Sequence, residues 1–574
     1  MKTLIFTICS FLAVGSFCLA DDAIWYGEPG SGSFGQPTNW NYNLVPGAWD
    51  RAIFPFMNYP YTVTFDTGYE NKAMVVDGAE MTLDLNGNEY YLNCDPSQDF
   101  SAVIGESDTL AMSSLRLVHG NVYSRDMVIG LWQDTHGQLT LSGPDAQWST
   151  LFNGNWNGVS LGQIGGDATL EVLEGAKFEH GHGASAIDAE CDVVVDVNGI
   201  DSQWYVDGQF DMSNWGNTTV DVINGGLVNI GKLTMALERG SSAQINVTGE
   251  NQQWGCGLWL HANWDNSLTI GKRGQAGIRV DGSQVWNQGT MTIAEEPGSH
   301  GLLEIHEGST VWCDNSVAVG GNFDSAGGAG RIELVDDTPG NGIETEFRVQ
   351  AEGQEYMIVW PGGTIVIDGG HITVLDNSGQ PNPIVLQGGT LEGNGYIWGH
   401  LENRGGLVAP SDAEGSKVLN IAYNYTQDST GTLKITIAGR EPVSQYAHLR
   451  VTSENYGQVS LDGMLDVDLI GGFVPDYEDE FAVIAAQNIS GTFSNAPSRY
   501  VFEGGSFDVI YNTDSYDSVI LTHYSPEPAC PRFSPADINK DCLVDLADFA
   551  MFAAEWLDCN LVPEFNCPGY VGVE

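Results

Sequence analysis

The stretch Val195-Asp-Val197, which precedes Gly199 and Trp204, returns 25 residues later as Val220-Asp-Val222. The same pattern of an apolar-polar-apolar triplet, then Gly, then an aromatic residue or Val, occurs seven times. The triplets are Leu139–Leu141, Leu170–Val172, Val195–Val197, Val220–Val222, Ile245–Val247, Ile278–Val280 and Leu303–Ile305. Alternation in a strand sends the flanking residues inward and the middle residue outward. A strand-rich repeat of this length is typical of one coil of a solenoid, which buries its inner face by stacking on the next coil.

The repeats predict an all-β chain with a parallel β-helix over residues 137–423. The regular period favours this fold over an array of β-sandwiches, which is the alternative. Residues 21–136 are expected to form a β region that caps the first coil. From residue 424 to 524 the strands lengthen, as in Leu433–Ile437, and we predict a β-rich cap over the open edge.

The middle residues of successive triplets, Glu171, Asp196, Asp221 and Asn246, should form an outward row with a spacing of ~4.8 Å. Like charges that are stacked in this way destabilise a sheet. A solvated face on an acidic protein is the simplest interpretation, since salt screens exposed charges. A bound cation or a general acid–base pair with one raised pKa are the alternatives.

Tryptophans form a second recurring set. Trp148, Trp204, Trp254 and Trp286 share one position of the repeat, and Trp156, Trp215 and Trp264 follow as Asn-Trp pairs. We expect the first group to stack inside the coil; an exposed row that binds sugar rings is the alternative. His180-Gly-His182 could hold a metal, but a Gly-rich turn with two exposed histidines is the preferred interpretation.

Composition limits the partners. The chain has 574 residues, 72 of them Gly, and a net charge of −54. This charge repels nucleic acid and anionic membrane surfaces. No stretch after the N-terminus has the ~18 consecutive apolar residues of a membrane span.

The first twenty residues are typical of an export signal. Lys2 supplies the positive charge, Leu4–Val14 the apolar core and Cys18-Leu-Ala20 a small-residue cleavage site. We therefore expect residues 1–20 to be removed from a secreted or cell-surface bacterial protein. In that oxidising setting Cys530, Cys542, Cys559 and Cys567 are expected to form two disulfides, with three connectivities open. Their spacing disfavours zinc. The other mature cysteines, expected to be buried thiols or long-range pairs, are Cys94, Cys191, Cys256 and Cys313.

Near the C-terminus, oxygen-bearing side chains occupy positions 1, 3, 5, 9 and 12 of a twelve-residue loop. They belong to Asp537, Asn539, Asp541, Asp545 and Asp548, with the backbone carbonyl of Leu543 at position 7. This order of ligands suits Ca²⁺, which accepts six to eight oxygens. Apolar residues at helical spacing follow, from Leu546 to Leu557.

This loop and helix resemble a type I dockerin, a small α module with calcium loops that binds partner cohesin domains. The resemblance implies a module over residues 536–568, after a Pro-rich linker at 525–535, and a cohesin-like partner. The chain departs from the family at Cys542, where Gly is usual, and it has one loop where two are usual.

Two further segments resemble autotransporter-like bacterial surface proteins: the region around Trp25-x-Gly27 and Asn39-Trp40, and the later Gly388–Gly395. This resemblance implies an extended and generally non-catalytic passenger. No nucleophile, zinc-protease or phosphate-loop motif occurs, so we assign no catalytic residue. We expect a structural or adhesive protein of an extracellular polysaccharide-associated complex. A polysaccharide hydrolase or lyase, or a carbohydrate-binding protein, is the alternative.

Overall fold

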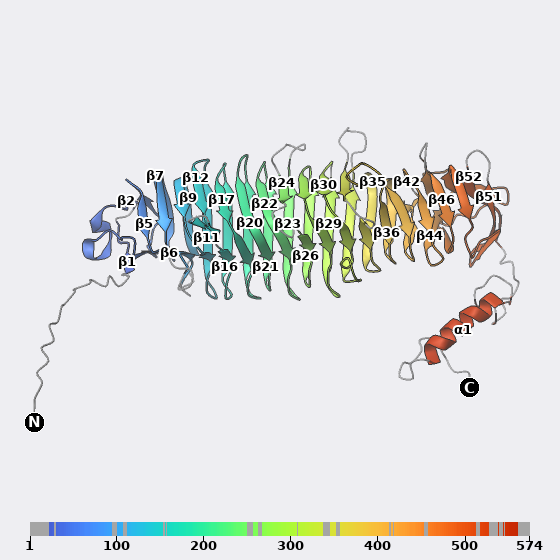
Figure 1. Cartoon of the computed structure of the whole chain (residues 1–574), viewed down its shortest axis with the longest axis horizontal. Helices are drawn as coiled ribbons and strands as arrows, with labels where there is room; N and C mark the ends of the chain where they lie inside the picture. Colours follow the sequence, from blue (N-terminus) through green and yellow to red (C-terminus); the bar gives the residue numbers. More distant parts are fainter. Residues whose placement is uncertain are drawn as a thin grey trace, which may run out of the picture. The chain divides into compact units, whose positions relative to one another are not determined.

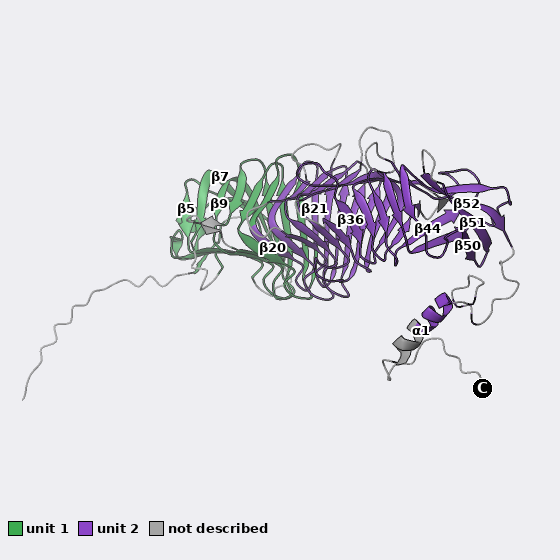
Figure 2. Cartoon of the chain, turned by 45° about the vertical axis from the view of Figure 1, so that its right-hand side comes forward, with its two compact units in different colours: residues 1–207, 216–218 green, residues 208–215, 219–574 purple. Residues whose placement is uncertain are grey.

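The computed structural model describes a large part of the chain, in two compact units. The described residues are 22–27, 30–93, 100–106, 112–152, 155–156, 158–249, 257–261, 267–306, 308–336, 345–351, 356–412, 415–416, 418–452, 457–512, 517–526, 536, 538, 544 and 546–560. Unit 1 comprises residues 1–207 and 216–218, and unit 2 comprises residues 208–215 and 219–574 (Figure 2). Strands β20 (Gln203–Met212) and β21 (Asn217–Ile223) contribute residues to both units.

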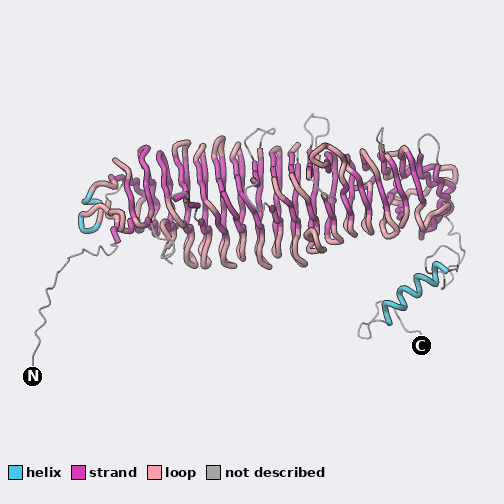
Figure 3. The backbone as a smooth tube through the Cα atoms, viewed as in Figure 1, coloured by secondary structure: helices cyan, strands magenta, loops and turns pink. Residues whose placement is uncertain are grey.

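The regular elements of unit 1 are almost all strands, joined by loops and turns, and strands of successive coils pair in parallel (Figure 3). The triplet stack, which contains the repeated triplets, comprises β4 (Tyr61–Thr64), β7 (Glu80–Leu92), β9 (Met112–Tyr123), β11 (His136–Ser142), β16 (Asp167–Leu173) and β19 (Asp192–Asn198). The second stack comprises β5 (Tyr69–Asn71), the ends of β7 and β9, β12 (Ala146–Ser149), β17 (Lys177–His180) and β20. The third comprises β1 (Asp22–Ile24), β3 (Arg51–Pro55), β6 (Ala73–Asp77), β8 (Ala102–Ile104), β10 (Met127–Ile129), β15 (Gly158–Leu161) and β18 (His182–Ser185).

Unit 2 repeats this arrangement of three parallel stacks (Figure 1). Its triplet stack comprises β23 (Ser242–Thr248), β26 (Gln275–Asp281), β29 (His300–His306), β32 (Ala329–Val335), β35 (Gly363–Leu375), β37 (Thr390–Trp398), β39 (Leu407–Ala409), β44 (Thr432–Ile437) and β47 (Met464–Leu469). The second stack comprises β22 (Leu227–Met235), β24 (Gly257–Leu260), β27 (Gln284–Asn287), β30 (Thr310–Cys313), β33 (Glu346–Gln350), the ends of β35 and β37, β42 (Val418–Ile421), β45 (His448–Val451) and β48 (Glu480–Ala486). The third comprises β25 (Ser267–Ile270), β28 (Thr290–Ile293), β31 (Val317–Val319), β34 (Met357–Val359), β36 (Pro383–Leu386), β38 (His400–Asn403), β43 (Tyr425–Gln427), β46 (Gln458–Leu461) and β49 (Asn488–Gly491).

The core of each unit is built from the flanking residues of the triplets. In unit 2, Ile245, Ile278, Leu303, Ile332 and Ile365 lie in register on adjacent strands, and none is more than 1 % exposed. Each such side chain contributes about 1.5–3 kcal/mol by leaving water. The predicted all-β chain of stacked parallel coils is therefore confirmed.

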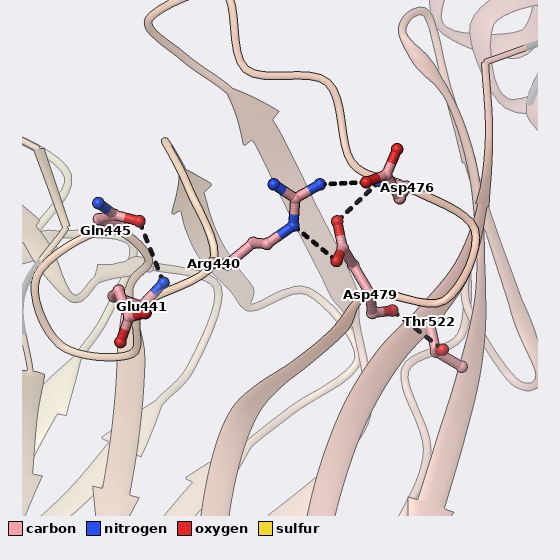
Figure 4. Close-up of polar contacts among 6 residues, drawn as sticks. All are labelled: Arg440, Glu441, Gln445, Asp476, Asp479 and Thr522. Atoms are coloured by element: carbon pink, nitrogen blue, oxygen red, sulfur yellow. Dashed lines mark hydrogen bonds and ion pairs between the residues drawn. The ribbon is translucent and has the colours of Figure 1, made fainter.

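Antiparallel strands end the described β structure of unit 2. Strand β52 (Asp517–Ser525) pairs antiparallel with β48, and β51 (Gly505–Asn512) and β50 (Arg499–Phe502) follow. These strands cover the backbone groups that an open edge would expose. Two loops beside them are joined by Arg440, whose Nε donates to Asp479 (2.7 Å) and whose Nη2 donates to Asp476 (2.5 Å; Figure 4). Asp479 therefore has a lowered pKa, chiefly through its hydrogen bond to Arg440.

Short elements complete the described structure. The 3-10 turns η1 (Pro37–Asn39) and η2 (Asn41–Asn43) lie near β2 (Ser31–Ser33) in the sequence. Two antiparallel hairpins consist of β13 (Leu151–Phe152) with β14 (Asn155–Trp156) and β40 (Ser411–Asp412) with β41 (Gly415–Ser416). The helix α1 (Leu546–Asn560) lies where the sequence predicts a helix after the acidic loop.

Candidate functional site

The predicted row of outward polar residues can be followed within each unit. Glu171 pairs directly with Asp196 in unit 1, and in unit 2 the amide of Asn246 donates to a carboxylate oxygen of Asp221 (2.8 Å). Glu171 Oε2 accepts hydrogen bonds from Gln138 Nε2 (2.9 Å) and Thr140 Oγ1 (2.6 Å). Amide and hydroxyl donors from neighbouring strands therefore offset part of the repulsion between the stacked carboxylates.

Further along unit 2 the row contains both signs of charge. Arg279 follows Asn246 in register, and Glu304 and Glu333 come next. Arg279 lies 3.5 Å from Asp281 and 4.0 Å from Glu304, as half-exposed ion pairs. Such pairs contribute ~0–1 kcal/mol each. The arrangement agrees with the interpretation of the row as a solvated face.

The aromatic position is buried in unit 1, as predicted. Trp148, Phe178 and Trp204 lie in register on β12, β17 and β20, and all three are at most 1 % exposed. The indole N–H of Trp148 donates to Ser124 Oγ (2.8 Å), and that of Trp204 donates to His180 Nε2 (2.9 Å). Both buried donors are therefore satisfied.

The expectation for Trp286 is wrong. Leu258, Val285 and Val311 occupy the inward position in β24, β27 and β30, so Trp286 lies one residue further and faces outward. It contacts Trp259 and Trp312, with ring centroids 6.1 and 6.3 Å apart and interplanar angles of 74° and 87°. A shift of one residue along a strand reverses the face of a side chain.

The other predicted tryptophans do not form a row among the described residues. Trp215 is 49 % exposed. Trp254, Trp264 and the side chain of Trp156 lie outside the described residues.

His180 is a core residue, which corrects the expectation of two exposed histidines. Its Nδ1 lies 3.2 Å from the carbonyl oxygen of His182, and its Nε2 accepts the bond from Trp204. Burial lowers the pKa of His180 to about 3, so the ring is neutral at ordinary pH. With both ring nitrogens engaged, His180 has no lone pair to offer a metal, and only His182 is exposed.

The acidic loop is described only at a few positions. Asp537, Asn539, Asp541, Leu543 and Asp545 lie outside the described residues. Asp548, in the first turn of α1, is 2 % exposed, and its Oδ1 accepts a hydrogen bond from the backbone N–H of Ile538 (2.6 Å). This contact brings loop positions 2 and 12 together and fixes the orientation of the Asp548 carboxylate. Carboxylate oxygens are among the ligands that Ca²⁺ prefers.

Two of the predicted cysteines are free thiols in the core. Cys191 and Cys313 are buried, and burial raises the pKa of Cys313 to about 12. Neither thiol is therefore suited to nucleophilic chemistry. The cysteines that lie outside the described residues, or whose side chains do, are Cys94, Cys256, Cys530, Cys542, Cys559 and Cys567.

Unit 2 has a hollow that the sequence analysis does not identify. It is an open groove of about 480 Å³ across the N-terminal halves of β23, β26, β29, β32 and β35 in unit 2. A smaller hollow of about 410 Å³ shares Ser242, Gln275 and His300 with it. The only signal for this groove in the sequence lies two residues before the middle of each triplet. At this position Gln244 in one coil is paired with Gly277 in the next.

Comparisons with known proteins give no family for this chain. No protein-family model matches it, and no curated protein matches it. Within the part of the chain that the structure describes, no helix is long and apolar enough to cross a membrane. Among those same residues, no three His, Cys, Asp or Glu side chains gather to form a metal site.

Proposed function

We propose that this protein is a secreted, non-catalytic structural or adhesive β-solenoid of a bacterial extracellular, polysaccharide-associated complex. In this proposal, a calcium-loaded, dockerin-like module attaches the solenoid to a cohesin-like partner. The observation that carries the proposal is the loop of oxygen ligands at positions 537–548, whose last carboxylate, Asp548, is buried against Ile538.

The exposed face of α1 supports a protein partner. Leu546, Phe549 and Phe552 follow one another at helical spacing and are 82 %, 65 % and 50 % exposed. Large apolar side chains that gather on one face of a helix mark an interaction surface. In the proposed complex, a cohesin-like domain covers this face, and calcium orients the helix by fixing the loop before it.

The chemistry of the groove supports a non-catalytic solenoid. Hydrolysis of a glycosidic bond uses two carboxyl groups that flank the substrate. The residues that line the groove and its adjoining hollow include Gln, Ser, Thr, His and Arg, but no Asp or Glu. The carboxylates of the outward row lie instead beside hydrogen-bond donors, as Glu171 does beside Gln138 and Thr140.

Calcium titration of the full mature chain tests the attachment module. Isothermal titration in salt, which screens diffuse binding to the acidic surface, should show one stoichiometric site. Asp541→Ala should abolish this site, whereas Asp324→Ala, at an exposed acidic position of unit 2, should leave it unchanged. Absence of a stoichiometric site in the unmodified chain would refute the module.

Capture of a type I cohesin domain tests the partner. The mature chain should bind immobilised cohesin in calcium and release it in chelator, and Phe549→Ala should weaken capture. Binding of calcium without any capture would leave a calcium module with a different partner and would reject the cohesin assignment.

A panel of plant and algal polysaccharides tests the absence of catalysis. We expect no release of reducing ends or unsaturated products. Turnover that disappears in Asp196→Asn or Asp221→Asn would overturn this part of the proposal in favour of a hydrolase or lyase.

A further inference from the structure

The groove in unit 2 crosses five successive coils in register. Its floor and one wall follow two outward columns of the triplet stack. The first column is Ser242, Gln275, His300 and Ala329, and the second is Gln244, Gly277, Leu302, Arg331 and Thr364. Because adjacent strands lie ~4.8 Å apart, each column presents one residue at that interval along the stacking direction.

Each column includes one small residue, Ala329 in the first and Gly277 in the second. At Gly277 an added Cβ would lie 2.4 Å from the side-chain oxygen of Gln244, so that side chain lies over the glycine. Gly301, Gly330 and Gly362 line the same groove, beside Ala243 and Ala276. The outcome is a channel with a shallow apolar floor and polar walls.

The groove is rich in uncharged hydrogen-bonding groups and close to neutral in charge. Ser242, Gln244, Gln275 and Thr364 contribute hydroxyl and amide groups. The guanidinium of Arg331 pairs with Glu333 at 2.9 Å and lies 3.8 Å from Glu392. Arg273, at the adjoining hollow, is held between Glu238 (3.0 Å) and Glu296 (2.8 Å). Arg331 at the groove and Arg273 at the adjoining hollow are thus each balanced locally by carboxylates.

Two classes of ligand fit this chemistry poorly. A polyanion is repelled by a chain of net charge −54 and finds Arg273 and Arg331 already paired. A peptide strand binds a sheet by its backbone at an open edge. Along the groove the strands on both sides already use these backbone groups in the parallel ladder.

We propose that the groove binds a linear, uncharged polysaccharide that runs along the stacking direction. Its hydroxyl groups would exchange hydrogen bonds with the amide, hydroxyl and imidazole groups of the two columns, and its ring faces would cover Leu302 and the small residues of the floor. The inference rests on the solenoid alone, so it stands whether or not the calcium loop binds a partner.

The experiment measures binding by the full mature chain in chelator, with calcium restored in a parallel series. Titration or affinity electrophoresis uses xylan, galactomannan, mixed-linkage β-glucan and soluble chitin oligosaccharides, with polygalacturonate as the charged polymer. We expect at least one neutral polymer to bind equally with and without calcium, and polygalacturonate not to bind.

Gly277→Tyr tests the location of the site. Gly277 does not have the left-handed φ that disfavours a side chain, and the group in its way is the flexible end of Gln244, so the coil should accept the tyrosine. The ring would fill the channel, and binding should fall at least tenfold. The matched control is Thr426→Tyr, at an exposed position of β43, which should bind as the unmodified chain does.

His300→Ala and Gln275→Ala provide a second line of evidence should Gly277→Tyr fold poorly. Each removes the hydrogen bonds of an exposed side chain and should weaken binding about five- to tenfold. Unchanged affinity in Gly277→Tyr and in both alanine variants would overturn the location. Binding of no neutral polymer, or of polygalacturonate alone, would overturn the proposed ligand. Loss of calcium binding with retained glycan binding would reject only the attachment module.

Discussion

Unit 1 and unit 2 use the same coil, but three adjacent strands in each fill its second stack in opposite ways. In unit 1 the inward position is aromatic on β12, β17 and β20, with Trp148, Phe178 and Trp204 in register after Val122 on β9. In unit 2 it is aliphatic on β24, β27 and β30, with Val285 and its neighbours inside and the indole rings of the following residues outside, before Phe347 on β33. The coil therefore requires a buried apolar side chain at this position, while its size and the residue beside it are free to vary. Function can change on the outer face without a change of fold.

The largest effect that separates the two units is expected from removing an indole. Trp204→Ala should destabilise the protein by about 3–5 kcal/mol, because it opens a cavity and leaves Nε2 of His180 without its donor. Trp286→Ala, on the outer face, should cost at most about 1 kcal/mol. Midpoints of urea unfolding compare the two. Equal losses would contradict the assignment of inner and outer positions.

The next effect is a dependence of stability on pH that comes from the buried His180 of unit 1. The pKa of His180 is lowered from 6.5 to about 3 by burial, so the folded state stays neutral where the unfolded chain takes up a proton. The contribution of His180 to the free energy of unfolding is therefore full above pH 6.5. It falls by about 1.4 kcal/mol per pH unit as the pH decreases from 6.5 to 3.

A matched variant isolates that contribution from the many carboxylates. His180→Gln keeps an acceptor for Trp204 but does not titrate, so its loss of stability relative to the unmodified chain should shrink as pH falls from 6.5 to 4.5. A constant difference over this range would mean that His180 is not buried and neutral.

These cases also show what the sequence could predict. The triplets from Leu139 to Ile305 identify the core correctly because alternation of apolar residues is itself the source of burial. The burial of His180 could be predicted from the sequence, since it lies two residues after the inward Phe178 and so on the same face. The outward position of Trp286 could not be predicted, because Val285 and Trp286 are both apolar and either could fill the coil.

The groove could not be predicted for a different reason. It depends on the register of Gln244, Gly277 and Arg331 across coils of unequal length, which only the folded pairing establishes. Read singly, Gly277 is one of 72 glycines. The calcium ligands differ from the groove, because the order of Asp537 to Asp545 along the chain is enough to predict a site. The calcium site itself stays a prediction.

A smaller effect is expected in the outward polar row. Glu171→Leu removes an acceptor from Gln138 and Thr140 and should cost about 1 kcal/mol. Glu304→Leu removes a half-exposed ion pair with Arg279 at 4.0 Å and should change stability by less than ~0.5 kcal/mol. Thermal unfolding of both variants at low and at moderate salt would distinguish these two contributions. A strong dependence on salt in Glu171→Leu would contradict the hydrogen-bonded row.

The smallest effect is expected when an outer indole of unit 2 is removed and the affinity for glycans is measured. A flat sugar-binding platform needs ring faces that are nearly coplanar, but Trp286 stands at 74° to Trp259 and at 87° to Trp312. Each ring presents its edge to the next, an arrangement that stabilises the row itself. Trp286→Ala should therefore change the affinity for the neutral polymers by less than about twofold, which is below ~0.5 kcal/mol. If Trp286→Ala abolished binding and Gly277→Tyr did not, the indole row rather than the groove would be the sugar-binding surface.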